Sequence, residues 1–381
     1  MKVAVAIDSF KGSLSSVQAG EAVRKAILRV DPDATVYVLP LADGGEGTVE
    51  ALCSGSGGQI VVTQVTGPLG APVTARFGIL PDKVTAVIEM ASAAGITLVP
   101  SEMRDPMVTT TYGVGELIRE AIHRGCRRFL IGIGGSATND GGVGMLQALG
   151  FDFTDEEGRS ITFGAAGLEK LHSISNKNAL PALQNCQFRI ACDVGNPLCG
   201  KNGCSAVFSL QKGASPGDVP KMDKWLSNYA AIASAINPDA DPDAPGAGAA
   251  GGSGFAFMTF TNAKLESGVQ LVINEANLEE YIREADIVVT GEGRLDGQTV
   301  MGKAPVGIAS LAKKYGKRVI AFSGCVSDDA ILCNDYGIDA FFPILRNICT
   351  LEEALDSEYA AHNLAETAYQ VFRLLNSNSK K

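Results

Sequence analysis

The stretch Arg128-Phe-Leu-Ile-Gly-Ile-Gly-Gly-Ser-Ala-Thr-Asn-Asp-Gly-Gly-Val-Gly144 joins an apolar segment to a loop of glycines, hydroxyl groups and one acid. The apolar part, Phe129–Ile133, has the length and composition of a buried strand. A helical pattern follows at residues 143–149. Glycine lets a backbone approach a ligand closely, and a helix N-terminus presents free N–H groups to anions. The stretch therefore predicts a strand, a loop suited to an anion, and a helix.

Apolar segments and helical patterns alternate in the same way over most of the 381 residues. Alternation with short connections predicts a parallel sheet covered by helices on both faces. The middle differs, because Ile60–Val65 and Val73–Leu80 flank the turn sequence Thr66–Pro72, which predicts antiparallel strands in a mixed sheet. A last helix is expected at about residues 351–375, before a polar tail. The predicted buried strands are residues 3–7, 36–41, 84–90, 129–133, 188–192, 287–290 and 319–323.

A chain of 381 residues is long for one domain, so two are expected. The fold class is α/β. Residues 1–64 and 285–381 are predicted to form a Rossmann-like domain with a parallel sheet built from both chain ends. Residues 65–284 are predicted to form an inserted mixed-sheet α/β domain. Ligands of such folds bind at the carboxyl ends of strands, often between domains, so the active site is expected in the interdomain cleft.

Composition excludes several classes of protein. No apolar run is long enough for a bilayer, and the net charge is −10 with no basic block beyond Lys380-Lys381, so neither membranes nor nucleic acids are expected partners. The start, Met1–Asp8, is too short and too soon acidic for a signal peptide and predicts a first strand. Nine cysteines without a Cys-x-x-Cys pair indicate reduced thiols in the cytoplasm and no zinc site. The three histidines, His123, His172 and His362, are expected to be structural.

Five predicted strand ends carry polar loops with acids, at residues 8–14, 43–47, 134–141, 192–200 and 290–299. Any one of them could be ordinary turn chemistry, but five at the edges of sheets indicate a site. The chain contains no G-x-S-x-G elbow, so the sequence does not support a serine hydrolase. Phosphoryl transfer to a hydroxyl needs Mg²⁺ with oxygen ligands, cations for the phosphates and a carboxylate near the acceptor. The loops supply the acids Asp8, Asp43, Glu46, Asp140, Asp193, Glu292 and Asp296, and the cations Lys11, Arg294 and Lys303.

Two glycine patterns suggest dinucleotide binding. Gly246–Gly251 fits G-x-G-x-x-G but follows no strand, which that motif requires. Gly132–Ala137 fits the alanine-ended variant, follows a strand, and has Asp152 about twenty residues on. The residues therefore leave open a nicotinamide-dependent dehydrogenase of a small hydroxy acid.

Two further segments, Gly195–Lys201 and Gly297–Lys303, fit the glycine and lysine positions of a P-loop. Asn202 and Ala304 replace the hydroxyl residue that would hold magnesium, so neither motif is complete. The second segment follows a strand, and Pro305 suits the first turn of a helix. Lys303 is thus expected either to bind a phosphate or to be a solvent-exposed lysine of the first helical turn.

Taken together, the loops resemble the bacterial glycerate kinase family, of the type that forms 2-phosphoglycerate. The resemblance implies ATP-dependent phosphorylation of D-glycerate with Mg²⁺, in a two-domain fold. The chain departs from the family pattern at Ile7, Gly195, Lys201 and Ser253, none of which removes a charged loop residue. The matching segments are residues 8–14, 42–48, 132–142, 191–200, 246–252 and 291–305.

With this resemblance, Asp193 is predicted to be the acid nearest the acceptor hydroxyl, as general base or magnesium anchor, and Lys11 and Lys303 to share in catalysis. A non-catalytic sensor of sugar acids stays an alternative. The protein is expected to act on D-glycerate and ATP in the cytoplasm, as a monomer or a homodimer. The predicted substrate and nucleotide contacts are Asp8, Ser9, Asp43, Gly44, Glu46, Gly134, Gly135, Ser136, Thr138, Asp140, Gly291, Glu292, Gly293, Arg294 and Asp296.

Overall fold

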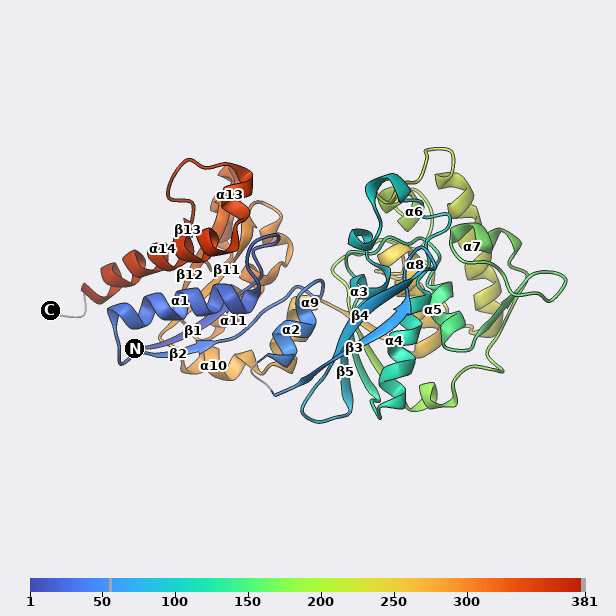
Figure 1. Ribbon diagram of the computed structural model, residues 1–381, viewed down its shortest axis with the longest axis horizontal. Coiled ribbons are helices and arrows are strands. Elements are labelled where there is room, and N and C mark those ends of the chain that lie inside the picture. Colours follow the sequence, from blue (N-terminus) through green and yellow to red (C-terminus); the bar gives the residue numbers. More distant parts are fainter. Residues whose placement is uncertain (55–56, 378–381) are drawn as a thin grey trace. The chain divides into compact units, whose positions relative to one another are not determined.

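The computed structural model describes residues 1–54 and 57–377, and the predicted terminal pair Lys380-Lys381 lies outside them. The chain divides into two compact units (Figure 1). Unit 1 contains residues 1–43, 50–54 and the chain from residue 269 onward. Unit 2 contains residues 44–49 and 55–268. Within residues 1–54 and 57–377, no helix has both the length and the apolar character of a transmembrane span.

Unit 1 is built around a five-stranded sheet in the order β13-β12-β11-β1-β2, and every pair in it is parallel. This sheet joins strands from both ends of the chain and confirms that prediction. Its strands are β1 (Lys2–Ile7), β2 (Thr35–Val38), β11 (Ile287–Leu295), β12 (Arg318–Val326) and β13 (Ala340–Pro343). Its helices are α1 (Ser16–Val30), α9 (Gly268–Glu275), α10 (Leu278–Glu284), α11 (Ala304–Lys314), α12 (Leu332–Asp335), α13 (Leu351–Leu355) and α14 (Ser357–Ser377). Helix α2 (Thr48–Cys53) crosses between the units.

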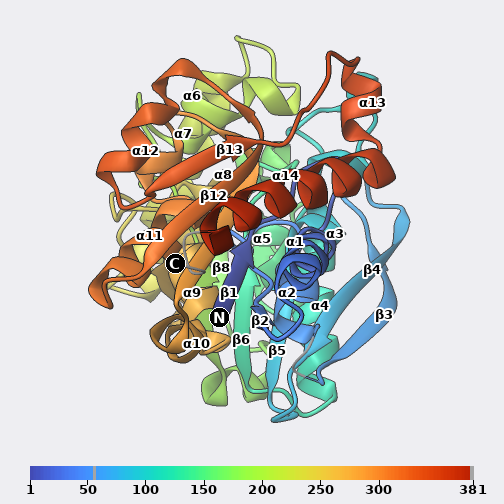
Figure 2. The same ribbon diagram turned by 90° about the vertical axis from the view of Figure 1, so that its left-hand side faces the viewer.

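Alternate side chains of the central strands face opposite layers of helices. Val5, Ile7 and Val289 belong to a buried cluster with apolar residues of α1 and α14, which lie side by side over one face (Figures 1 and 2). Helix α11 packs against β11 and β12 on the other face. Both faces are covered, which explains why the buried segments 3–7, 287–289 and 319–322 of the central strands are wholly apolar.

The predicted last helix is two helices, so that prediction was wrong in detail. Asp356 adopts an extended conformation and ends α13. Its carboxylate then accepts a hydrogen bond from the N–H of Tyr359 at 2.8 Å, in the first turn of α14. An aspartate in this position stabilises a new helix start, and this local effect interrupts the apolar periodicity.

Unit 2 contains a six-stranded mixed sheet in the order β10-β9-β6-β5-β4-β3. The antiparallel ribbon of β3 and β4 is visible in Figure 2, and it confirms the predicted pair. The strands are β3 (Gln59–Thr66), β4 (Pro72–Ile79), β5 (Thr85–Glu89), β6 (Arg128–Gly132), β9 (Gln187–Ala191) and β10 (Lys264–Glu266), with a separate pair β7 (Asp152–Thr154) and β8 (Ser173–Ser175). The helices are α3 (Ala91–Ala94), α4 (Tyr112–His123), α5 (Val143–Ala148), α6 (Cys204–Phe208), α7 (Val219–Ile236) and α8 (Ala249–Thr261).

The bounds of the units differ from the predicted divisions at 64/65 and 284/285. All eight residues of β3 pair with β4, so this strand lies in unit 2. Helices α9 and α10 lie in unit 1, where Val269 packs directly against Gly307 of α11. Sequence periodicity does not reveal which sheet a strand or helix joins, because that depends on contacts between distant segments.

The glycine- and alanine-rich segment at residues 239–254 leads into α8. Ala250, Gly251 and Gly252 have left-handed backbone conformations there. A side chain at Gly251 would come within 2.1 Å of the carbonyl oxygen of Thr138. Glycine is therefore required for close packing of this segment against the loop after β6.

Ser16 links the ends of the first two strands of unit 1. Its buried hydroxyl donates to the carbonyl oxygen of Ile7 at 2.6 Å and accepts from the N–H of Leu41 at 2.7 Å. These two residues precede Asp8 and Asp43 closely in the chain. The hydroxyl therefore fixes the two loops relative to one another.

We expect Ser16→Ala to leave both buried backbone groups unpaired, at a cost of about 1–3 kcal/mol in local stability. Hydrogen exchange of the Leu41 amide should accelerate accordingly. Ser234→Ala is the matched control, because the Ser234 hydroxyl donates only to a carbonyl of the preceding helical turn. Unchanged exchange at Leu41 in Ser16→Ala would contradict this role.

Candidate functional site

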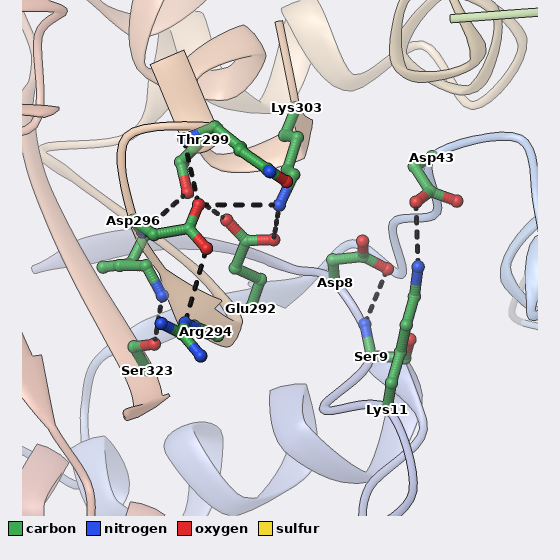
Figure 3. Close-up of polar contacts among 12 residues, drawn as sticks. Asp8, Ser9, Lys11, Asp43, Glu292, Arg294, Asp296, Thr299, Lys303 and Ser323 are labelled. Atoms are coloured by element: carbon green, nitrogen blue, oxygen red, sulfur yellow. Dashed lines mark hydrogen bonds and ion pairs between the residues drawn. The ribbon is translucent and has the colours of Figure 1, made fainter. Parts of the chain in front are cut away.

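Asp8 leaves β1 at the carboxyl edge of the sheet of unit 1 (Figure 3). Its backbone N–H donates to the carbonyl oxygen of Gly291 on β11 at 2.9 Å. Asp8 is 5% exposed, and its carboxylate accepts a hydrogen bond from the N–H of Ser9 at 2.6 Å. Burial, and then the negative charge of Asp43, raises the pKa of Asp8 to about 7. Asp8 is thus a buried acid that lacks a full counter-charge.

Lys11 lies in the same loop and reaches toward Asp43, with 3.1 Å between its Nζ and the carboxylate (Figure 3). The side chain is 68% exposed, so this ion pair is accessible to a ligand. Partial burial acts to lower the pKa of the Lys11 amine. The nearby Asp43 carboxylate has the larger total effect, so the pKa is raised. Exposed ion pairs contribute little to stability, so a ligand anion can recruit this lysine at small cost.

The end of β11 brings further charges to this edge. Lys303 Nζ lies 3.9 Å from carboxylate oxygens of both Glu292 and Asp296. Arg294 Nε lies 3.4 Å from Asp296 (Figure 3). The hydroxyl of Thr299 donates to Glu292 at 2.7 Å, and burial raises the pKa of Glu292. The acids therefore hold two cations at one place.

Lys303 is the residue that precedes the first turn of α11, and Pro305 lies in that turn, as predicted. No side chain caps the start of this helix. Free N–H groups at a helix start favour anions, and the Lys303 ammonium adds a charge at the same position. The incomplete P-loop segment thus has the strand, loop and helix of a phosphate-binding turn without its magnesium-binding hydroxyl.

This edge of unit 1 unites most of the predicted site residues. No group of three or more His, Cys, Asp or Glu side chains in the described part of the chain is arranged to hold a metal by itself. Mg²⁺ often needs only one or two carboxylates when phosphates supply other ligands, and the undercompensated Asp8 fits that requirement. The predicted residues that gather here are Asp8, Ser9, Lys11, Asp43, Gly291, Glu292, Gly293, Arg294, Asp296 and Lys303.

A hollow of about 850 Å³ lies at the amino edge of the same sheet. Asp286 and Arg318 line it, next to the starts of β11 and β12. Lys313, another lining residue, is paired with Asp339 at 2.6 Å. Ligands of parallel α/β sheets bind at the carboxyl edge, so we assign no role to this hollow.

In unit 2 the loop after β6 carries Gly134 and Gly135, both exposed, and Ser136, which is 8% exposed. The N–H of Ile96 donates to the carbonyl oxygen of Gly135 at 2.9 Å and so holds the loop. Gly135 has a φ of 74°, which favours glycine. Lys212, buried below the loop, donates to the Ser136 hydroxyl at 2.9 Å.

Asp140 is 1% exposed, so its geometry differs from the predicted ligand contact. Its carboxylate accepts from the N–H and the hydroxyl of Thr111, and from the N–H groups of Gly142 and Gly144. The protein's own carboxylate therefore takes the place at the start of α5 that the sequence assigned to a ligand anion. Burial raises the pKa of Asp140, and these hydrogen bonds oppose the increase. Thr138 is likewise fully buried.

Asp193 follows β9, and its carboxylate accepts from the N–H of Gly268 at 3.1 Å. Gly44 packs against both Ala191 and Gly268, with a φ of 83° and no space for a side chain. Glu46 lies close enough to the buried Glu89 for its charge to contribute to the raised pKa of that acid. These predicted residues belong to unit 2, whereas the charged edge described above belongs to unit 1.

Three residues of these regions were missed in the sequence. Glu89 ends the apolar β5 and accepts from the N–H of Val49 at 2.8 Å, and an acid at the end of an apolar strand was a usable signal. Thr299 stood in a quoted loop but has a hydroxyl like many turn residues. Lys212 gave no signal, because an isolated lysine in a loop is normally exposed.

The dinucleotide patterns do not have the required structure. After β6 ends at Gly132, α5 begins only at Val143, so the glycines do not open directly into a helix. Asp152, the expected ribose contact, instead accepts from the amide of Asn178 at 2.8 Å. The nicotinamide alternative is therefore not favoured.

The two units carry glycine-rich turns, carboxylates and lysines at the ends of parallel strands, an arrangement that suits a two-domain α/β enzyme of the phosphotransferase class. The model of the Glycerate kinase family matches residues 3–376. The chain belongs to the glycerate kinase family. The predictions of this family and of a kinase with an alcohol acceptor are thereby confirmed.

Individual relatives match this chain over nearly their whole lengths. "Glycerate 2-kinase" of Escherichia coli K12 is 48% identical, with 96% of this chain and 98% of the relative covered. "Glycerate kinase" of Haemophilus influenzae is 46% identical, with 98% and 99% covered. A solved crystal structure of a candidate glycerate kinase 2 from Salmonella typhimurium LT2 is 45% identical, with a TM-score of 0.91 and 100% of both chains covered. The predicted fold class is confirmed by this likeness.

We expect Asp8→Asn to stabilise the protein at pH 8 in the absence of Mg²⁺. The unfolded chain releases the Asp8 proton near pH 4 and the folded protein near pH 7, so the wild type loses stability as pH rises through this window. The variant should therefore gain up to about 4 kcal/mol at pH 8 and nothing below pH 4, measured by thermal unfolding over this range.

Asp82→Asn is the control, because the opposite change in folding stability is expected for it. Partial burial opposes the charge of Asp82, but hydrogen bonds from Thr85, Val84 and Arg128 lower its pKa to about 2. This variant should lose stability at pH 7 and equal the wild type only near pH 2. Equal pH profiles for Asp8→Asn and the wild type would contradict the assignment of Asp8.

Proposed function

We propose that this protein transfers the γ-phosphoryl group of ATP to the 2-hydroxyl of D-glycerate, with Mg²⁺, to form 2-phosphoglycerate. The observation that carries the proposal is the charged edge of unit 1, where Lys11, Arg294 and Lys303 lie among four carboxylates (Figure 3). Membership of the glycerate kinase family supports glycerate as the acceptor.

The triphosphate is assigned to unit 1. Lys303 stands at the uncapped start of α11, where its ammonium and the helix N–H groups suit phosphate oxygens. Lys11 and Arg294 are exposed, and among the described residues each pairs with a partly buried carboxylate, Asp43 and Asp296 respectively, so both cations can turn to the phosphates. Gly291 is required for the close approach of β12, because a Cβ there would come within 2.1 Å of the carbonyl oxygen of Phe322. These three cations would stabilise the negative charge that develops during transfer.

Magnesium, when bound, would neutralise phosphate charge and orient the transferred group. Asp8 is the first candidate to hold it, because its carboxylate is buried and repelled by Asp43. Glu292, also buried, is the second candidate. A bound cation would favour the ionised form of both acids and so release the proton that Asp8 holds near pH 7.

Asp193 is proposed as the acid that receives the proton of the glycerate 2-hydroxyl. It lies two residues after the end of β9, and the hydrogen bond from the N–H of Gly268 at 3.1 Å orients its carboxylate. A general base must lie within hydrogen-bond reach of the hydroxyl that attacks the phosphoryl group. The predicted role of Asp193 as a magnesium anchor is the competing assignment.

We also propose a cytoplasmic location. Cys126, Cys204 and Cys333 are free thiols in the buried interior, and Cys325 is an exposed free thiol. Unpaired thiols suit a reducing compartment.

The direct test is ADP release from ATP with D-glycerate, L-glycerate or no acceptor, each with and without Mg²⁺. We expect release only with D-glycerate and Mg²⁺, and phosphorus NMR should identify 2-phosphoglycerate. A 3-phosphoglycerate product would refute the regiochemistry, and release without an acceptor would indicate an ATPase.

The assignment of Lys303 is tested by Lys303→Met. We expect a fall in kcat/KM of about 100-fold or more, because a charge-assisted contact to the transferred phosphate is lost. Lys313→Met on the same helix is the matched control, since Lys313 is paired with Asp339 away from this edge. Similar losses in the two variants would refute a direct role for Lys303.

The assignment of Asp193 is tested by Asp193→Asn, which keeps the oxygen that accepts from Gly268. We expect kcat to fall by about 100-fold or more, as when a general base is removed. Asp223→Asn is the matched control, because Asp223 also accepts from a glycine N–H, that of Gly200 at 2.9 Å. Near-normal turnover of folded Asp193→Asn would exclude Asp193 as the base.

A further inference from the structure

Lys212 is a buried lysine in the core of unit 2. It ends a short 3₁₀ helix, Leu210–Lys212, and is 4% exposed. Its ammonium donates to the hydroxyl of Ser136 at 2.9 Å and to the carbonyl oxygen of Thr138 at 2.7 Å. Both acceptors belong to the glycine loop after β6. The amine therefore supports that loop from the interior.

The charge of Lys212 has no direct partner. It forms no ion pair within the described part of the chain, although a buried ammonium is normally paired with a carboxylate. The field of Asp140 reaches it, but that carboxylate already accepts four hydrogen bonds from Thr111, Gly142 and Gly144. Burial lowers the pKa of Lys212 to about 8, and Cys204 and Asp140 offset only part of the effect. Lys212 is thus a buried positive charge without a counter-ion.

The loop above it has unused donors. Among the described residues, the backbone N–H groups of Gly134, Gly135 and Ser136 have no acceptor. The Ser136 hydroxyl oxygen accepts from Lys212, so its own hydrogen can point away from the lysine. Gly134 and Gly135 are exposed and carry no side chain that would block a ligand. Three N–H groups and one polarised hydroxyl are therefore available to an anion.

We propose that Gly134, Gly135 and Ser136 form the subsite for the carboxylate of glycerate, with Lys212 as the positioning residue that orients Ser136 and supplies the balancing charge. This proposal rests on the proposed function for the identity of the acid.

A carboxylate suits this loop better than a triphosphate does. One buried positive charge and several neutral donors match a single negative charge at short range. A triphosphate carries several charges and brings a metal ion, which calls for several cations and accessible carboxylates. Those groups lie at the edge of unit 1, whereas the acid of this loop, Asp140, is buried and saturated.

A comparison of a charged ligand with a neutral one distinguishes the proposed role of Lys212 from simple support of the loop. D-glyceramide has the shape of D-glycerate but a neutral amide in place of the carboxylate. Loss of the charge of Lys212 should weaken glycerate binding and leave glyceramide binding almost unchanged. A lysine that only holds the loop in place would affect both compounds alike.

The experiment is calorimetric titration of the full-length protein with D-glycerate and with D-glyceramide, in the absence of ATP, together with the KM for ATP. We expect Ser136→Ala and Lys212→Met to weaken D-glycerate binding by about tenfold or more, as for a hydrogen bond to a charged group. Glyceramide affinity should change by less than about twofold in Lys212→Met, and in Ser136→Ala it should fall less than glycerate affinity does, because only a neutral hydrogen bond is lost. The KM for ATP should change by less than about twofold in both variants. Ser209→Ala is the control, because this buried serine donates only to the backbone of Ser205.

The outcomes separate this proposal from the proposed function. Ser136→Ala leaves Lys212 in place, so it gives an answer even where Lys212→Met fails to fold. Equal weakening of glycerate and glyceramide, a rise in the KM for ATP alone, or no binding of D-glycerate by the wild type would each overturn the subsite. Charge-selective binding of D-glycerate through Ser136 without ADP release would support the subsite and refute the kinase activity.

Discussion

The parallel pairing of β1 with β11 is the contact on which the candidate site of unit 1 depends. The two strands come from opposite ends of the chain, and their register sets Ile7 beside Gly291. Asp8 and Glu292 follow these residues, so both carboxylates reach the same edge of the sheet. Without this pairing, Lys11 would not lie near Glu292, whose negative charge reaches it. The buried faces of the strands make the pairing stable, since apolar layers of helices cover both of them.

Burial disfavours the charged form of Asp8 in unit 1 and that of Lys212 in unit 2. Burial raises the pKa of Asp8 to about 7 and lowers that of Lys212 to about 8. Each group costs folding stability, and each would be stabilised by a ligand of opposite charge. Perturbed groups of this kind concentrate where a protein binds or transforms charged molecules, because stability alone would favour their replacement. Asp140 shows the contrasting case, a buried acid whose oxygens are satisfied by the protein itself.

Local patterns predicted the elements well where they were strong. The turn between Ile60–Val65 and Val73–Leu80 gave the antiparallel ribbon, and Pro305 marked the start of α11. The prediction failed where a local effect overrode periodicity, as at Asp356, which divides the last helix. The start of α5 was predicted at the correct position, but the group that accepts its N–H hydrogen bonds was not predicted. That group is the Asp140 carboxylate, which is held by Thr111, a residue distant in sequence that contacts it only in the folded protein.

The sequence by itself determined the class of fold, the loops that carry chemistry and the family, because strand and helix periods and glycine-rich turns are local properties of the chain. Only the tertiary structure decided which of the loop residues act together. It placed Lys303 between Glu292 and Asp296, turned Asp140 inward, and buried Lys212 below Ser136. Burial and charge balance depend on contacts between distant segments, so the same residue type is a ligand-facing group in one loop and an internal support in another.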